Sequence, residues 1–141
     1  MITRRKHASA EAEAEHTADV ALAAQFDHLL DAARAAEQEF RRAQAAARPA
    51  DEVYPLAKRL DEALTEAMRA AYAAQRAEIG PLGYDDWIYR RKARAKSAVR
   101  ALTDEAERLL TLRETHRLTG MPPARRTDLP DSAAVTHVPA T

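Results

Sequence analysis

Apolar side chains recur at steps of three and four residues along most of the chain, the spacing of one face of an α-helix. The first stripe, between about residues 10 and 48, consists of Leu22, Phe26, Leu29, Ala33, Ala36, Phe40, Ala43 and Ala47. A similar stripe within residues 55–79 consists of Leu56, Leu60, Leu64, Ala67, Met68, Ala71 and Tyr72. A third, within residues 85–118, consists of Ile88, Ala95, Val99, Leu102, Ala106 and Leu109. The pattern therefore predicts three long helices and an all-α protein.

Proline and glycine mark where these helices are expected to begin and end. Pro49 ends the first helix, and Pro55 suits the first position of the second, where a missing N–H costs nothing. The sequence Gly-Pro-Leu-Gly at residues 80–83 is a strong helix breaker before the third helix. Short connections of this kind make successive helices antiparallel neighbours.

The third helix carries its own start and stop signals. Asp85 is the expected N-cap, with Tyr84 and Tyr89 at the two positions of a hydrophobic staple. Gly120 ends the helix, and the proline-containing residues 119–141 show no periodicity. We expect an extended tail there.

The predicted architecture is an elongated antiparallel three-helix bundle over residues 10–118, preceded by a basic arm over residues 1–9. Alanine is the most frequent residue and glycine occurs only 3 times, which favours thin, closely packed helices. Cysteine is absent, which excludes disulfides, thiolate metal sites and cysteine nucleophiles. Neither a signal peptide nor a membrane span is evident, so a cytoplasmic protein is expected.

The 22 basic and 22 acidic residues balance, but one stretch concentrates positive charge. Residues 84–96 read YDDWIYRRKARAK. Cations bind phosphates and aromatic rings stack on bases, so the stretch indicates contact with RNA or single-stranded DNA. The candidate residues, with a basic triplet near the N-terminus, are Trp87, Tyr89, Arg90, Arg91, Lys92, Arg94, Lys96, Arg100, Arg4, Arg5 and Lys6.

The same stretch is also typical of an ordinary solvated helix. Opposite charges stand four residues apart in the pairs Asp86–Arg90, Arg100–Asp104 and Asp104–Arg108. Such pairs stabilise an exposed helix face without any ligand. If these pairs neutralise its positive charge, the stretch has no role in binding nucleic acid.

Two residues of the stretch have an environment that helical spacing leaves open. Arg91 falls on the apolar side, where it would have to extend its charge to water or meet a carboxylate. Trp87 is either a core residue, a cation–π partner of Arg91, or an exposed contact residue.

Metal and catalytic signatures are weak. Glu13 and His16 have the Glu-x-x-His step of di-iron bundles, but the second copy that such a site needs is missing. The sequence has no glycine-rich phosphate loop and no nucleophile-elbow serine. We therefore expect no enzyme, no metal and no cofactor.

Alanine covers more than one face of the first two predicted helices. Small residues on a second face allow close approach of another chain, through Ala32, Ala35, Ala70 and Ala74. This predicts a protein partner or self-association. Alanine is also a good exposed helix former, so the alternative is a face that simply meets solvent.

In size and helical architecture, residues 10–118 resemble the small all-helical subunits of multi-subunit CRISPR effector complexes. The residues that carry the resemblance are the aromatic and basic stretch 87–100 and the basic arm 4–6. The resemblance implies a non-catalytic subunit that packs on larger protein subunits and contacts a nucleic-acid strand by charge. The alternative is a structural or adaptor protein, such as a phage virion component or coiled-coil partner, acting by helix packing alone.

Overall fold

The computed structural model describes residues 7–121, and every regular element in that range is helical. The all-α class is therefore confirmed for the described residues. In chain order they form α1 (Ala10–Ala23), α2 (Phe26–Ala45), α3 (Ala50–Ile79), α4 (Leu82–Asp85), α5 (Trp87–Ala93), α6 (Ser97–Thr115) and the π-helical turn η1 (His116–Gly120). The predictions for Arg4, Arg5, Lys6 and residues 122–141 lie outside the described residues.

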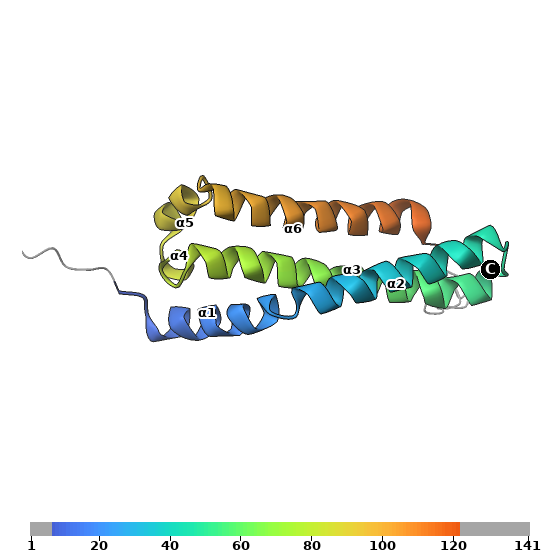
Figure 1. Cartoon of the computed structure of the whole chain (residues 1–141), viewed down its shortest axis with the longest axis horizontal. Coiled ribbons are helices and arrows are strands. Elements are labelled where there is room, and N and C mark those ends of the chain that lie inside the picture. The colour runs from blue at the N-terminus through green and yellow to red at the C-terminus, as the bar shows by residue number, and fades with distance from the viewer. Residues whose placement is uncertain (1–6, 122–141) are drawn as a thin grey trace, which may run out of the picture.

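Helix α3 is the central element of the molecule (Figure 1). It packs against α6 on one side and against α1 on the opposite side, while α2 continues from α1 and crosses α3 obliquely. The chain reverses direction on both sides of α3, so α3 runs antiparallel to its neighbours. The apolar stripes predicted three uninterrupted helices, but two of these three are broken into shorter helices in the structure.

The first predicted helix is two helices. Ala24 and Gln25 separate α1 from α2, and the N–H of Gln25 donates to the carbonyl of Leu22 at 3.0 Å, a tighter turn than the α-helix. Residues 24 and 25 contain neither proline nor glycine, so the sequence does not mark this break. Helix α2 also ends early, and Ala47 takes a positive φ of 49° before Pro49.

The second predicted helix begins earlier than expected. Helix α3 starts at Ala50, with Pro49 as the residue before it, so Pro55 lies inside the helix rather than at its first position. Proline lacks the N–H of the ordinary i→i−4 bond, but its φ is already helical. Because Pro55 is exposed and close to the helix start, the first turns of α3 continue through it.

The third predicted helix is also interrupted, and its N-cap is Asp86 rather than Asp85. The Asp86 carboxylate accepts the N–H groups of Ile88 and Tyr89 at 3.0 and 3.1 Å. Asp85 instead accepts the backbone N–H of Ser9 at 2.8 Å. Helix α5 ends at Ala93, and a turn at residues 94–96 precedes α6.

This turn changes the helical phase on which three predictions depended. Arg91, expected on the buried side, is exposed, and Ala93 is buried in its place. Ile88 and Ala95 were also expected to face inward and are exposed.

Because the N-cap is Asp86, Tyr84 stands two residues before the cap and no longer at a staple position. Its hydroxyl donates to the carboxylate of Asp19.

Two groups of buried residues hold the layers together. The larger joins α2, α3 and α6 through Ala33, Ala36, Phe40, Ala57, Leu60, Leu64, Ala67, Ala71, Ala106 and Leu109. The smaller, near α5, consists of Ile79, Ala93 and Val99. The many alanines let the helices approach closely, so the core is thin.

The predicted alanine interface is only partly available. Ala70 is 0% exposed and Ala74 is partly buried, because α3 has neighbours on both sides. Ala70 therefore packs within the chain, and the prediction that it belongs to a partner surface is wrong. Ala32 and Ala35 of α2 are exposed.

Across residues 7–121, no helix combines the length and the apolar character needed to span a bilayer.

Candidate nucleic-acid interface

An open groove of about 680 Å³ lies between α3, α5 and α6. Helix α5 and the turn after it supply Trp87, Arg90, Arg91 and Arg94. The other lining residues are Tyr72, Gln75 and Arg76 of α3 and Thr103 and Glu107 of α6. The groove therefore combines four arginines with two aromatic rings and one carboxylate.

Trp87 is the first residue of α5, and 61% of it is exposed. The cap made by Asp86 holds this helix start in place. Neighbouring Ile88 and Tyr89 are also exposed, so the start of α5 presents a cluster of large apolar side chains to solvent. The alternative in which Trp87 fills the core is therefore wrong, because most of its side chain meets solvent.

Positive charge near α5 is not neutralised by neighbouring carboxylates. Within residues 7–121, these five cations make no ion pair: Arg91, Lys92, Arg94, Lys96 and Arg100. Of the two predicted partners of Asp104, Arg100 is among these five, and Arg108 instead binds Glu105 at 2.7 Å. The sixth cation, Arg90, donates from Nη1 to the carbonyl of Gly83 at 3.2 Å.

Arginines elsewhere in the described residues mostly have carboxylate partners. Arg41 binds Glu37 at 2.8 Å, and Arg59 binds Glu39 at 3.1 Å. The cations at residues 91–100 therefore differ from most arginines on the other helices, which form the salt bridges typical of a solvated helix.

The structure brings together only part of the predicted site. Trp87, Arg90, Arg91 and Arg94 line one groove, as a shared function requires. Four other predicted residues lie on α5, the turn after it or the first turn of α6 without lining the groove, namely Tyr89, Lys92, Lys96 and Arg100.

Sequence reasoning missed the wall that α3 contributes. Gln75 is buried and donates from Nε2 to the Thr103 hydroxyl at 2.7 Å, which ties α3 to α6 at the groove. Arg76 lines the groove while donating to Asp19 of α1. These residues come from distant parts of the chain, so no local spacing could have revealed them.

Glu107 is the carboxylate that lines the groove, and within residues 7–121 it makes no ion pair. A negative charge here weakens the attraction of the groove for an anion. Arg76 is already neutralised by Asp19, so Arg90, Arg91 and Arg94 carry the available positive charge of the groove.

A polar network beside the groove shifts two pKa values. Burial raises the pKa of the Tyr84 phenol, and its hydrogen bond to the Asp19 carboxylate raises it further. Burial alone would raise the pKa of Asp19, but hydrogen bonds from Arg76 and Tyr84 outweigh burial and lower it. Asp19 therefore remains ionised and holds Arg76 at neutral pH.

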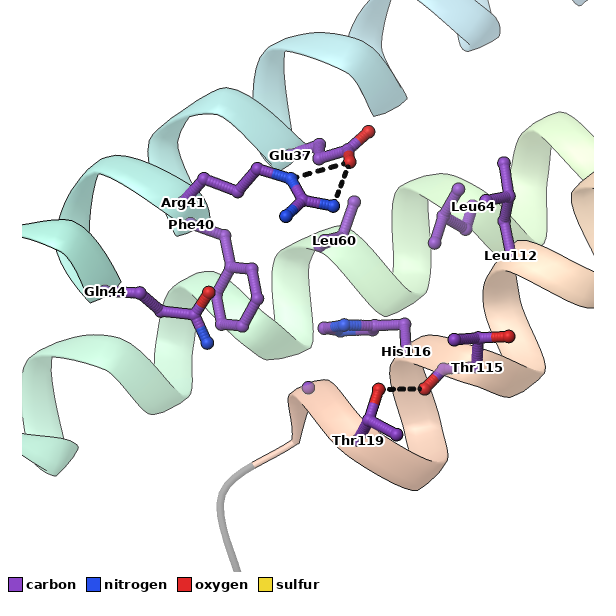
Figure 2. Close-up of a pocket in the computed structure, with 11 residues that line it drawn as sticks. Glu37, Phe40, Arg41, Gln44, Leu60, Leu64, Leu112, Thr115, His116 and Thr119 are labelled. Atoms are coloured by element: carbon purple, nitrogen blue, oxygen red, sulfur yellow. Dashed lines mark hydrogen bonds and ion pairs between the residues drawn. The ribbon is translucent and has the colours of Figure 1, made fainter.

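A smaller pocket, of about 220 Å³, lies at the end of α3 remote from the groove, between α2, α3, α6 and η1 (Figure 2). His116 lies on its floor, with Nε2 2.8 Å from the carbonyl of Ala57 and its ring edge-on to Phe40 at 5.2 Å. At the rim, Arg41 is bound to Glu37. His116, Arg41 and Glu37 therefore have partners within the chain.

Within residues 7–121, no three His, Asp or Glu side chains gather as a metal site requires. His16 of the Glu-x-x-His step lies against α3, with Nε2 3.1 Å from the carbonyl of Ala77. No family model, curated protein or solved structure matches this chain. Its function therefore has to be inferred from the groove and its surroundings.

Proposed function

We propose that this chain is a non-catalytic helical subunit of a nucleoprotein assembly, which holds the backbone of RNA or single-stranded DNA in the groove between α3, α5 and α6. The observation that supports this most is the run of cations at residues 91–100 that make no ion pair within residues 7–121. Such side chains keep their full charge for phosphates.

The groove residues of α5 are spaced for a strand. Trp87, Arg91 and Arg94 follow each other at steps of four and three, which keeps them on one side of the helix. All three line the groove. An exposed ring beside two free guanidinium groups combines base stacking with phosphate contact.

The groove offers cations and aromatic rings, which suit holding a strand. The larger protein subunits of such an assembly, and the resemblance to CRISPR effector subunits, remain predictions. Salt dependence gives a direct test of backbone contact, because each phosphate contact releases counterions.

The experiment is a fluorescence anisotropy titration with labelled single- and double-stranded RNA and DNA at low and moderate salt. The double variant Arg91→Ala/Arg94→Ala should weaken binding. It should also reduce the slope of log affinity against log salt concentration by about 1.4, because each phosphate contact with a single strand contributes about 0.7. The matched control is Arg41→Ala/Arg59→Ala, which removes two arginines that already have carboxylate partners. Equal losses in both double variants would contradict a site in the groove.

A structural adaptor is the second candidate, and one observation favours it. Trp87, Ile88 and Tyr89 are exposed together, and tryptophan and tyrosine are enriched at the energetic centres of protein interfaces. A strand has no need of Ile88, which does not line the groove. Ile88→Ser should therefore disrupt a protein complex, while leaving strand affinity unchanged.

A further inference from the structure

Helix α1 is attached to the molecule differently from α2. Its only buried apolar residue is Ala12, whereas α2 buries Ala33, Ala36, Phe40 and Ala43. Burial of larger apolar side chains is the main source of attachment between helices. The docking of α1 therefore depends strongly on polar contacts.

Those polar contacts lie along one side of α1. Ser9 donates its N–H and its hydroxyl to Asp85 at 2.8 and 3.0 Å. His16 contacts the carbonyl of Ala77 in α3. Asp19 accepts two hydrogen bonds from Arg76, and a third from the hydroxyl of Tyr84.

The chain has a natural hinge for α1. The turn at Ala24 and Gln25 interrupts the helix between α1 and α2, whose direction changes there (Figure 1). Rotation about a few residues of this turn allows α1 to leave α3 without disturbing the larger core group, which contains no α1 residue.

Arg76 connects α1 to the groove. Its Nε and Nη2 are 2.8 and 3.0 Å from the two carboxylate oxygens of Asp19, and its side chain also lines the groove. The Asp19 side chain is only 13% exposed, whereas that of Arg76 is 44% exposed. One guanidinium thus serves both the α1 contact and the groove wall.

We infer that docked α1 is an autoinhibitory arm: Asp19 neutralises Arg76, and release of α1 returns that cation to the groove for the strand phosphates. This regulation rests on the proposed function of the same groove. By thermodynamic linkage the effect is reciprocal, so a bound strand that draws Arg76 away from Asp19 also weakens the docking of α1.

The test compares the full-length protein with Asp19→Asn, which keeps the size of the side chain and removes its charge. Binding to a labelled 20-nucleotide oligo(dT) is measured by anisotropy at low salt, and docking of α1 by amide hydrogen exchange. We expect faster exchange within Ala10–Ala23 and an affinity at least about five-fold higher, the lower end of typical coupling.

Asp61→Asn is a closely matched control. Asp61 also accepts hydrogen bonds from one arginine through both carboxylate oxygens, from Nε and Nη2 of Arg117 at 2.6 and 3.2 Å. Neither residue lines the groove. This variant should leave both oligo(dT) affinity and the exchange of α1 unchanged. A similar gain in affinity in both variants would show an effect of net charge alone and overturn the inference.

The unmodified protein provides a second measurement that needs no substitution. Saturation with oligo(dT) should speed amide exchange within α1, and unchanged or slower exchange there overturns the regulation. Equal affinity in the unmodified protein and Asp19→Asn also overturns it, while leaving strand binding intact. If neither protein binds oligo(dT), the proposed function fails and the regulation fails with it.

Discussion

Asp19 and Arg76 form a two-bond ion pair between helices that are far apart in sequence, with the Nε–Oδ2 and Nη2–Oδ1 distances at 2.8 and 3.0 Å. Tyr84 donates its hydroxyl to the same carboxylate. A residue of α1 thereby offsets the positive charge of an arginine that lines the groove on the other side of α3. This contact links the stability of the N-terminal helix to the electrostatics of the candidate site.

Acid should remove this contribution to stability. Although burial alone raises the pKa of Asp19, hydrogen bonds from Arg76 and Tyr84, together with the positive charge of Arg76, bring it below its usual value. A lowered carboxyl pKa stabilises the folded state above the unfolded pKa of about 4, and this is lost as pH falls through the folded pKa.

The measurement is the difference in unfolding free energy between the unmodified protein and Asp19→Asn from pH 7 to pH 3. We expect about 1 kcal/mol at neutral pH, since Arg76 is partly exposed and its ion pair is screened by solvent. The difference should shrink toward zero in acid. A difference that stays constant over this pH range would show that the Asp19 charge contributes nothing.

Trp87→Ala should separate binding from stability. Because Trp87 is 61% exposed, its loss should change the free energy of unfolding by less than about 0.5 kcal/mol. Strand binding should weaken by about 1–3 kcal/mol if a base stacks on the ring. Circular dichroism during denaturation and anisotropy with oligo(dT) measure the two quantities.

Trp87→Phe is the matched control, because it keeps a smaller aromatic ring at the same position. It should retain part of the affinity that the alanine variant loses. If the alanine variant instead loses much of its free energy of unfolding, Trp87 contributes to the packing of the helices and is not a free contact residue.

Glu107→Gln should increase affinity for a strand. Glu107 lines the groove, so its charge repels phosphates there, and removing it should strengthen binding by a few tenths to about 1 kcal/mol at low salt. Glu62→Gln makes the same charge change on an exposed face of α3, outside the groove. Equal effects of the two variants would mean that binding follows net charge and not the groove.

Ala70→Leu tests the position of α3 at the centre. Ala70 has no exposed surface, so a larger side chain overpacks the contact between helices and should cost about 1–3 kcal/mol of unfolding free energy. Ala32→Leu adds the same atoms at an exposed site on α2 and should be nearly neutral. Thermal unfolding of both variants measures the difference, and a stable Ala70→Leu protein would contradict the central packing.

The apolar stripes located the core well where the pattern was strong. Phe40, Leu60, Leu64, Val99 and Leu109 were all predicted to face inward, and all are buried. The same approach failed at Ile88 and Arg91, because an unbroken helix was assumed through the turn that follows Ala93. A break of a few residues changes which side chains face the core.

The candidate site was predicted only in part for a related reason. Trp87, Arg91 and Arg94 are close in sequence, so helical spacing could group them. Arg76 and Thr103 join them only because α3 and α6 lie side by side. The sequence also suggested ion pairs for Arg100 and Arg108 with Asp104, but Arg108 binds Glu105 instead.

The sequence by itself determined that this protein is helical and where its aromatic and basic stretch lies, because helix propensity and apolar periodicity act over a few neighbouring residues. Only the tertiary structure decided that α3 is central, that Ala70 is buried and that Asp19 forms an ion pair with Arg76. It also left cations 91–100 without ion pairs inside residues 7–121. The charge available to a ligand depends on which distant carboxylates folding brings close enough to neutralise each cation.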